Sequence, residues 1–385
     1  MLRRKIGLDL PGRVHNMARH STRRTIVKHK FETLDGLRGI AAIAVLLFHR
    51  REWFGGPAFF GHAFLAVDFF FMLSGFVIAH AYEARLSAPG SLGGFVRDRI
   101  IRLHPLLALG SALGCAAFAI KALRAGEPLP FGAFAASFVP FPVFWANMES
   151  CFPINLPTWS LFWELLVNLV FALTVRRLTN SVLIAIIAAS AIAMIGVSIP
   201  ARGFQVGLDN PWLLWGIPRV CVSFFAGVLM LRLFRAGRRL PFSLGWMAPL
   251  LLLASFLLPH DHPLSWLYDP LIVFLLYPVI LMSAAATAPA LPRLTRFSAD
   301  LSYPLYVLHV PILSFVALVF AKAGLTHGTP DMVRGAAILL VTVAICYAAG
   351  LFYDVPVRRF LRARWGSRSH RDAPLSAVDP AAAGR

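Results

Sequence analysis

The chain has 385 residues, of which 58% are apolar and only 14% are charged. Globular domains carry about 25% charged residues, so this composition excludes an ordinary soluble domain. The formal net charge of +19 is high enough to suggest a nucleic-acid partner. The placement of the basic residues, described below, explains that charge by membrane topology, and we therefore expect no nucleic acid.

Ten segments are apolar over roughly the 18–23 residues that a helix needs to cross a ~30 Å hydrocarbon core. In chain order they are 34–50, 60–83, 101–123, 156–175, 181–199, 212–234, 246–259, 268–288, 302–322 and 333–353. The seventh is short, and residues 131–146 contain two prolines that favour a surface or re-entrant piece. The sequence therefore predicts an all-α protein, a polytopic membrane bundle of about ten transmembrane helices.

An even number of spans places both ends of the chain on one side of the membrane. The tails and loops on that side hold most of the 37 Lys and Arg residues, which is typical of the cytoplasmic face. We therefore predict a basic, flexible cytoplasmic tail over 1–30, a membrane domain over 31–362 and a flexible cytoplasmic tail over 363–385. The basic face would attract anionic membrane lipids.

The four cysteines are not arranged as disulfide partners or metal ligands. Three of them lie in predicted spans, where cysteine behaves as a small apolar residue. Their positions are Cys115, Cys151, Cys221 and Cys346, and their spacing matches no zinc or redox motif. We therefore expect no metal.

Four ionisable side chains lie inside apolar segments: His49, Asp68, Glu164 and His309. Each costs roughly 2.5–3.5 kcal/mol to insert in lipid, so such residues usually mark a working site or an ion path. Counting 1.5 Å per residue from the end of each predicted span places all four between the midplane and the external face. The alternative is that each carboxylate pairs with a basic residue to lock two helices and that each histidine only packs.

A basic constellation lies at the predicted cytoplasmic mouth of the bundle. The segment RDRIIRLHP contains Arg97, Arg99 and Arg102, and Arg38 lies one turn into the first span. Arg99 and Arg102 share a helix face by their spacing, and guanidinium groups bind phosphate through paired hydrogen bonds. An ordinary positive-inside anchor explains Arg97 well, but it explains Arg38 poorly because Arg38 lies within an apolar helix.

Six motifs follow one another along the chain: LDGLRGIAAIAVLLFH, VDFFFMLSGFVI, RIIRLHP, PTWSLFWE, LSYPLYVLH and YDVPVRRF. In this order they resemble the bacterial acyltransferase-3 family of integral-membrane O-acyltransferases, over about residues 31–362. The resemblance implies transfer of an acyl group, commonly acetyl from cytoplasmic acetyl-CoA, to a hydroxyl of an extracytoplasmic glycan or lipid-linked sugar in the bacterial inner membrane. It assigns the essential residues of the first motif to Arg38 and His49.

The sequence departs from the family pattern at three positions. His104 stands where an aromatic residue is common, Phe162 where a small polar residue is common, and Asp354 where Glu is frequent. These departures could alter donor or acceptor preference without abolishing activity.

Acyl transfer from a thioester needs a base, a stabilised oxyanion and a dry site. Neutral imidazole is the natural base near neutral pH, so we predict that His49 deprotonates the acceptor and that Asp68 or Glu164 orients it. Trp159, Ser160, Tyr303 and His309 are expected to bind the substrate, although interfacial aromatics and helix-end polar groups would give the same pattern. Arg38, Arg99 and Arg102 are expected to hold the phosphates of acyl-CoA.

A proton-coupled secondary transporter is the alternative function. It would use the two histidines and two carboxylates as a proton relay. The sequence has no Gly/Pro-broken helices in matching halves, which transporters with inverted repeats tend to show. A structural membrane protein would instead tolerate neutral residues at the charged positions. The acceptor, and acetyl against succinyl or a longer acyl group, stay open at this point.

Overall fold

The computed structural model describes residues 31–51, 56, 59–88, 90–144, 150–260, 262–322 and 332–366. The chain divides into Met1–Lys30 and Phe31–Arg385, and the fold below is that of the second unit. The tail predicted over 1–30 lies outside the described residues. The tail predicted from 363 onward begins as helix, and its remainder also lies outside them.

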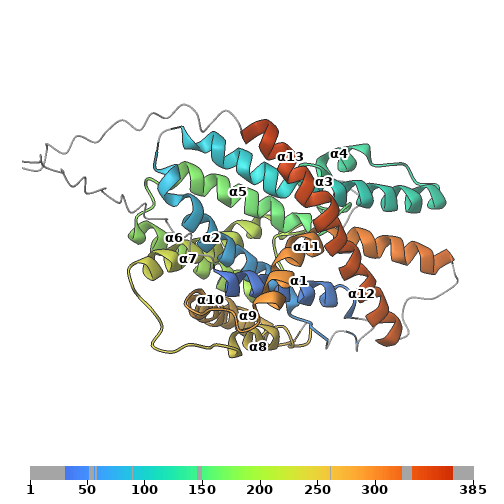
Figure 1. Ribbon diagram of the computed structural model, residues 1–385. Coiled ribbons are helices and arrows are strands. Elements are labelled where there is room, and N and C mark those ends of the chain that lie inside the picture. Colours follow the sequence, from blue (N-terminus) through green and yellow to red (C-terminus); the bar gives the residue numbers. More distant parts are fainter. Residues whose placement is uncertain are drawn as a thin grey trace, which may run out of the picture. The chain divides into compact units, whose positions relative to one another are not determined.

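All regular structure in the described residues is helical (Figure 1). The first half contains α1 (Glu32–Phe48), the short 3-10 turn η3 (Ala63–Leu65), α2 (Ala66–Leu86), α3 (Ser91–Ala125), α4 (Phe131–Ser137), α5 (Thr158–Thr174) and α6 (Asn180–Ser198). The second half contains η4 (Leu213–Trp215), α7 (Gly216–Arg235), α8 (Met247–Ala254), α9 (Ser265–Leu271), the π-helical turn η5 (Ile272–Leu276), α10 (Tyr277–Ala285), α11 (Pro292–Lys322), α12 (Met332–Ala349), the π-helical turn η6 (Gly350–Asp354) and α13 (Val355–Gly366). The predicted all-α class is confirmed.

Seven helical stretches among the described residues are long and apolar enough to cross a membrane. The helices α1 and α5, with 17 residues each, are slightly shorter. The seventh predicted span differs: α8 has 8 residues, about 12 Å of helix, which is too short to cross by itself. Of the segment 131–146, the described residues 131–144 form only the short α4 before the chain leaves the helix, as the two prolines indicate.

The helices α1 and α11 lie side by side and run in the same direction. Their contact is built on small residues: a methyl group at Gly36 would lie 2.9 Å from Thr295, and one at Gly39 would overlap the backbone of Ser298. The Ser298 hydroxyl also donates to the Gly36 carbonyl over 2.8 Å. Small residues allow this close backbone approach where lipid gives no hydrophobic drive.

A second close pair joins α2 to α7. A side chain at Gly75 would overlap the carbonyl of Phe224, and one at Gly227 would overlap the carbonyl of Met72. Within the apolar windows, 72% of α2 is buried but only 28% of α6. The helix α2 is therefore central to the bundle, while α6 presents apolar side chains such as Ile184 and Ile192 outward, as a lipid-facing helix does.

We predict that Gly227→Leu destabilises the bundle, because the side chain has no room against α2. Overpacking of a core costs about 1–3 kcal/mol or more. The measurement is the thermal unfolding midpoint of the detergent-solubilised protein. Gly196→Leu on α6 is the matched control, because a side chain there meets nothing within 4 Å. Equal midpoints for the two variants would contradict the packing described here.

Candidate functional site

Four arginines from three helices face one another at the N-terminal end of α1. We name Arg38 (α1), Arg99 and Arg102 (α3) and Arg358 (α13) the arginine cluster. Arg102 interacts electrostatically with each of the other three. Cationic side chains repel one another when they are brought together in a low dielectric, so the cluster needs anionic partners.

The protein supplies part of this negative charge. Arg38 pairs with Asp35 over 3.2 Å and donates through Nε to the Ser302 hydroxyl over 3.0 Å. Arg358 pairs with Asp354 over 2.7 Å. The Nε atoms of Arg99 and Arg358 are buried and have no hydrogen-bond partner among the described residues. Buried donors of this kind are rarely left unpaired, so these two nitrogens are available to an anionic ligand.

Glu164 belongs with the arginine cluster and lies apart from the histidines. It interacts electrostatically with Arg38 and Arg99, and its Oε1 accepts a 2.7 Å hydrogen bond from the Ser74 hydroxyl. The expectation that Glu164 shares a layer with His49 is therefore wrong. The reason is direction: counting residues along α5 gives a depth but does not say which way the side chain faces, and Glu164 faces Ser74 and the arginines.

His49 and His309 come together at the other end of α1. Their ring centroids lie 5.1 Å apart, and we name them the histidine pair. His49 closes α1 as its C-terminal cap residue, and His309 is only 1% exposed. The parallel packing of α1 on α11 brings them together. The same packing brings Arg38 to Ser302, about two turns earlier on α11.

A polar stripe on α11 connects the arginine cluster with the histidine pair. Ser302, Tyr306 and His309 are spaced four and three residues apart, which places them on one helix face. The Tyr306 hydroxyl lies 2.5 Å from the Ser160 hydroxyl of α5. Ser160 also lies 3.1 Å from the Pro157 carbonyl, and either hydroxyl can be the donor between Ser160 and Tyr306.

Two of the predicted substrate-binding residues already have partners inside the protein. Tyr303 donates to the Leu103 carbonyl over 2.5 Å and thereby ties α11 to α3 beside the arginine cluster. Trp159 lies under the Arg219 guanidinium, 5.1 Å from the ring centroid. The substrate-binding roles of both residues, and of Ser160, stay predictions.

Asp68 lies in a buried ion pair with Arg219 of α7. Arg219 Nε donates to Asp68 Oδ1 over 3.0 Å, and Nη2 donates to Oδ2 over 2.7 Å. Arg219 also donates to the carbonyls of Val206 and Phe64, and both side chains of the pair are at most 1% exposed. No contact between either predicted carboxylate and either histidine occurs in the described part of the chain, so the orienting role of Asp68 finds no geometric support.

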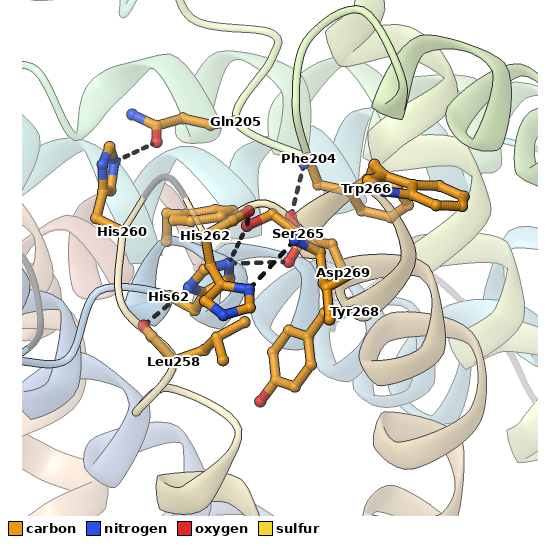
Figure 2. A network of polar contacts seen from close by, with 12 residues as sticks. His62, Phe204, Gln205, Leu258, His260, His262, Ser265, Trp266, Tyr268 and Asp269 are labelled. Atoms are coloured by element: carbon orange, nitrogen blue, oxygen red, sulfur yellow. Dashed lines mark hydrogen bonds and ion pairs between the residues drawn. The ribbon is translucent and has the colours of Figure 1, made fainter.

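A buried serine and histidine lie together in a second polar network (Figure 2). His62 lies 2.9 Å from the Leu258 carbonyl through Nδ1 and 3.0 Å from the Ser265 hydroxyl through Nε2. The Ser265 hydroxyl also lies 2.7 Å from the His262 carbonyl. The Leu258 carbonyl can only accept, so Nδ1 of His62 donates to it, while either Nε2 or the Ser265 hydroxyl can be the donor between those two groups.

Asp269 completes the network but does not make it a catalytic triad. Its Oδ1 lies 3.4 Å from His62 Nε2, and its Oδ2 accepts from the Phe204 amide over 2.8 Å (Figure 2). In a triad the carboxylate and the serine bond opposite ring nitrogens, whereas here both face Nε2. The network therefore ties α9 to the chain entering α2 and α7, and it is structural.

Three residues with clear structural partners could not be assigned from the sequence. Arg219 was one more basic residue at the edge of a span, although a buried aspartate in an apolar helix requires such a partner. Tyr306 lies three residues before His309, and this spacing predicts that the two side chains share a helix face. Arg358 was part of the basic C-terminal segment, and only the fold brings α13 beside α3.

Among the described residues, no group of three or more His, Cys, Asp or Glu side chains could hold a metal ion. The apolar helices define a polytopic helical membrane protein. Its buried charged groups lie in separate clusters: the arginine cluster, the Asp68–Arg219 ion pair and the histidine pair.

The family model described as an acyltransferase domain matches residues 31–351. The chain therefore belongs to the acyltransferase-3 family, and it is a multi-pass membrane acyltransferase. It is 38% identical to "Protein 2 in picA locus" of Rhizobium radiobacter, over 43% of this chain and 93% of that protein. It is 25% identical to "Acyltransferase MdmB" of Streptomyces mycarofaciens, over 91% of this chain and 97% of that protein. No solved structure matches the chain.

We predict that Asp68→Asn strongly destabilises the protein, because it leaves Arg219 charged and buried. Breaking a buried pair costs about 3–5 kcal/mol. The double variant Asp68→Leu/Arg219→Met, which removes both charges, should recover much of the thermal midpoint lost by Asp68→Asn. The folded fraction of each variant should keep its specific activity. A stable Asp68→Asn protein without activity would contradict this structural role.

Proposed function

We propose that this protein transfers an acyl group, in the first place acetyl, from cytoplasmic acyl-CoA to a hydroxyl of an extracytoplasmic glycan or lipid-linked sugar in the bacterial inner membrane. One observation carries the proposal. The arginine cluster and the histidine pair lie at opposite ends of α1, and the polar stripe of α11 runs between them. One end suits a phosphate-bearing donor and the other suits proton transfer.

The donor end is supported by the orphaned guanidinium nitrogens. Arg99 and Arg358 each keep a buried Nε without a hydrogen-bond partner among the described residues. Each of them also interacts electrostatically with Arg102. Guanidinium groups bind phosphate with geometric specificity. Helix α13 adds its basic residues on the same side, which agrees with the positive-inside bias expected of the cytoplasmic face.

The distance between the two ends suits a long, thin acyl carrier. Arg38 and His49 are eleven residues apart on α1, which is about 16 Å of helix. An extended pantetheine arm has a comparable length. The phosphates of CoA would therefore stay at the arginine cluster while the thioester reaches the histidine pair along the α11 stripe.

The histidine pair supplies the base for the acceptor hydroxyl. General-base catalysis by a positioned imidazole contributes about 10²–10⁴ in rate. The apolar surroundings of the pair keep bulk water from hydrolysing the thioester. Glu164, with Arg38 and Arg99 around it, would instead help shape the entrance for the donor.

The alternative of a proton-coupled transporter explains less of the site. A proton relay would use the histidine pair, but it gives the arginine cluster no role. The acyltransferase family and the acyltransferase relative both support group transfer.

We expect Arg99→Gln to weaken acyl-CoA binding. A hydrogen bond to a charged group is worth about 1.5–3 kcal/mol, so the KM for acetyl-CoA should rise roughly 10–100-fold. Arg293→Gln is the matched control, because Arg293 is exposed in the first turn of α11. Unchanged KM values in both variants would contradict the assignment of the cluster to the donor.

We expect His49→Ala to lower acyl transfer at least about 100-fold. The assay supplies radiolabelled acetyl-CoA to inverted membrane vesicles, whose cytoplasmic face is outward, and counts label in the glycan fraction. Lys121→Ala, at an exposed position of α3, is the control that should stay near wild type. Full activity of His49→Ala would remove His49 from the mechanism.

A further inference from the structure

His309 has a hydrogen-bonding state that the fold imposes on it. Its Nδ1 lies 2.9 Å from the carbonyl oxygens of both Leu305 and Tyr306. A carbonyl oxygen can only accept, so Nδ1 must carry a proton. In the neutral imidazole, Nε2 is then an acceptor with a free lone pair.

The free lone pair of Nε2 is buried. His309 is 1% exposed, and its Nε2 has no hydrogen-bond partner in the part of the chain that the structure describes. A histidine that only packs satisfies both ring nitrogens, because an unpaired buried polar atom is destabilising. The vacant acceptor therefore points to a hydroxyl or N–H that arrives with a substrate.

The backbone around His309 is fixed in a way that keeps this acceptor in place. Pro311 lacks an N–H, so it cannot bond the Val307 carbonyl one turn earlier in α11. The Asn155 side chain donates to that carbonyl instead over 3.1 Å. This bond ties α11 to the chain just before α5 and holds the turn that carries His309.

His49 can exchange a proton with His309. Their ring centroids lie 5.1 Å apart at an interplanar angle of 44°. Among the described residues, the charged groups acting on His49 are Arg50 and Arg51, together with His309 itself, and no carboxylate is among them. Like charges repel in low dielectric, and the pair therefore holds a single extra proton at most.

We propose that His309 is the catalytic base of the proposed acyl transfer and that His49 passes the proton on. This assignment rests on the proposed function and deepens it. The acceptor hydroxyl donates to His309 Nε2 in the bound state.

The step balances with one proton. The hydroxyl O–H bond breaks and its proton goes to His309 Nε2 while the oxygen forms a bond to the thioester carbonyl carbon. His309 passes this proton to His49. The tetrahedral intermediate then collapses, the C–S bond breaks, and the leaving thiolate takes the proton from the His49 imidazolium, so both imidazoles end neutral and the products are the ester and free CoA.

The test uses substitutions that separate the two nitrogens of His309. His309→Asn keeps an amide N–H near the position of Nδ1 and removes Nε2. In the inverted-vesicle assay with radiolabelled acetyl-CoA, we expect transfer to fall at least about 100-fold. We also expect the KM for acetyl-CoA to stay within about twofold, and the thermal midpoint to stay close to wild type.

Chemical rescue covers the case in which His309→Asn fails to fold. His309→Gly leaves space for a free base, and added imidazole should restore part of the transfer rate. The same imidazole should not raise the rate of wild type. Transfer by His309→Asn within about threefold of wild type, or a loss in His309→Gly that imidazole does not reverse, would overturn the assignment.

The outcomes also separate this assignment from the proposed function. Transfer that depends on His49 but not on His309 would overturn only the role of His309. A wild-type protein that moves no label from acetyl-CoA would overturn the proposed function itself, and the assignment with it.

Discussion

The parallel contact of α1 with α11 is the constraint on which the site depends. Gly36 and Gly39 let the two backbones approach so closely that Ser298 bonds the α1 backbone directly. Because the helices run in the same direction, residues that follow one another along α1 contact residues that follow one another in the same order along α11. Arg38 thus meets Ser302 and His49 meets His309. A larger residue in this seam would separate both pairs at once, since one contact positions both ends of the site.

Burial in a low dielectric then decides which charged groups are structural. Asp68 and Arg219 neutralise each other through paired hydrogen bonds. The arginine cluster is only partly neutralised, by Asp35 and Asp354. Nitrogens of Arg99, Arg358 and His309 are among the buried polar atoms that remain without a hydrogen-bond partner in the described residues. These nitrogens are the ones that the proposed reaction would use.

The sequence predicted much of the fold and less of the site. The length of the apolar segments predicted most spans, but within the apolar segment 246–259 the helix α8 ends after about two turns. Depth counting placed His49 and His309 together because both lie on the α1–α11 seam. It failed for Glu164, since depth does not say which way a side chain faces, and Ser74 and the arginines determine that. It could not find Arg219 for Asp68, because the partner of a buried charge comes from a helix about 150 residues away. The tautomer of His309 depends on its carbonyl neighbours, which only coordinates show.

The central claim is that one bound donor reaches from the arginine cluster to the histidine pair. A cryo-electron microscopy structure of the protein with a non-hydrolysable acetyl-CoA analogue tests it most directly. The account predicts phosphate density against Arg99, Arg102 and Arg358, and the acetyl end beside His49 and His309. Phosphates bound at another surface, or an acyl end that stays at the membrane face away from the histidines, would contradict it.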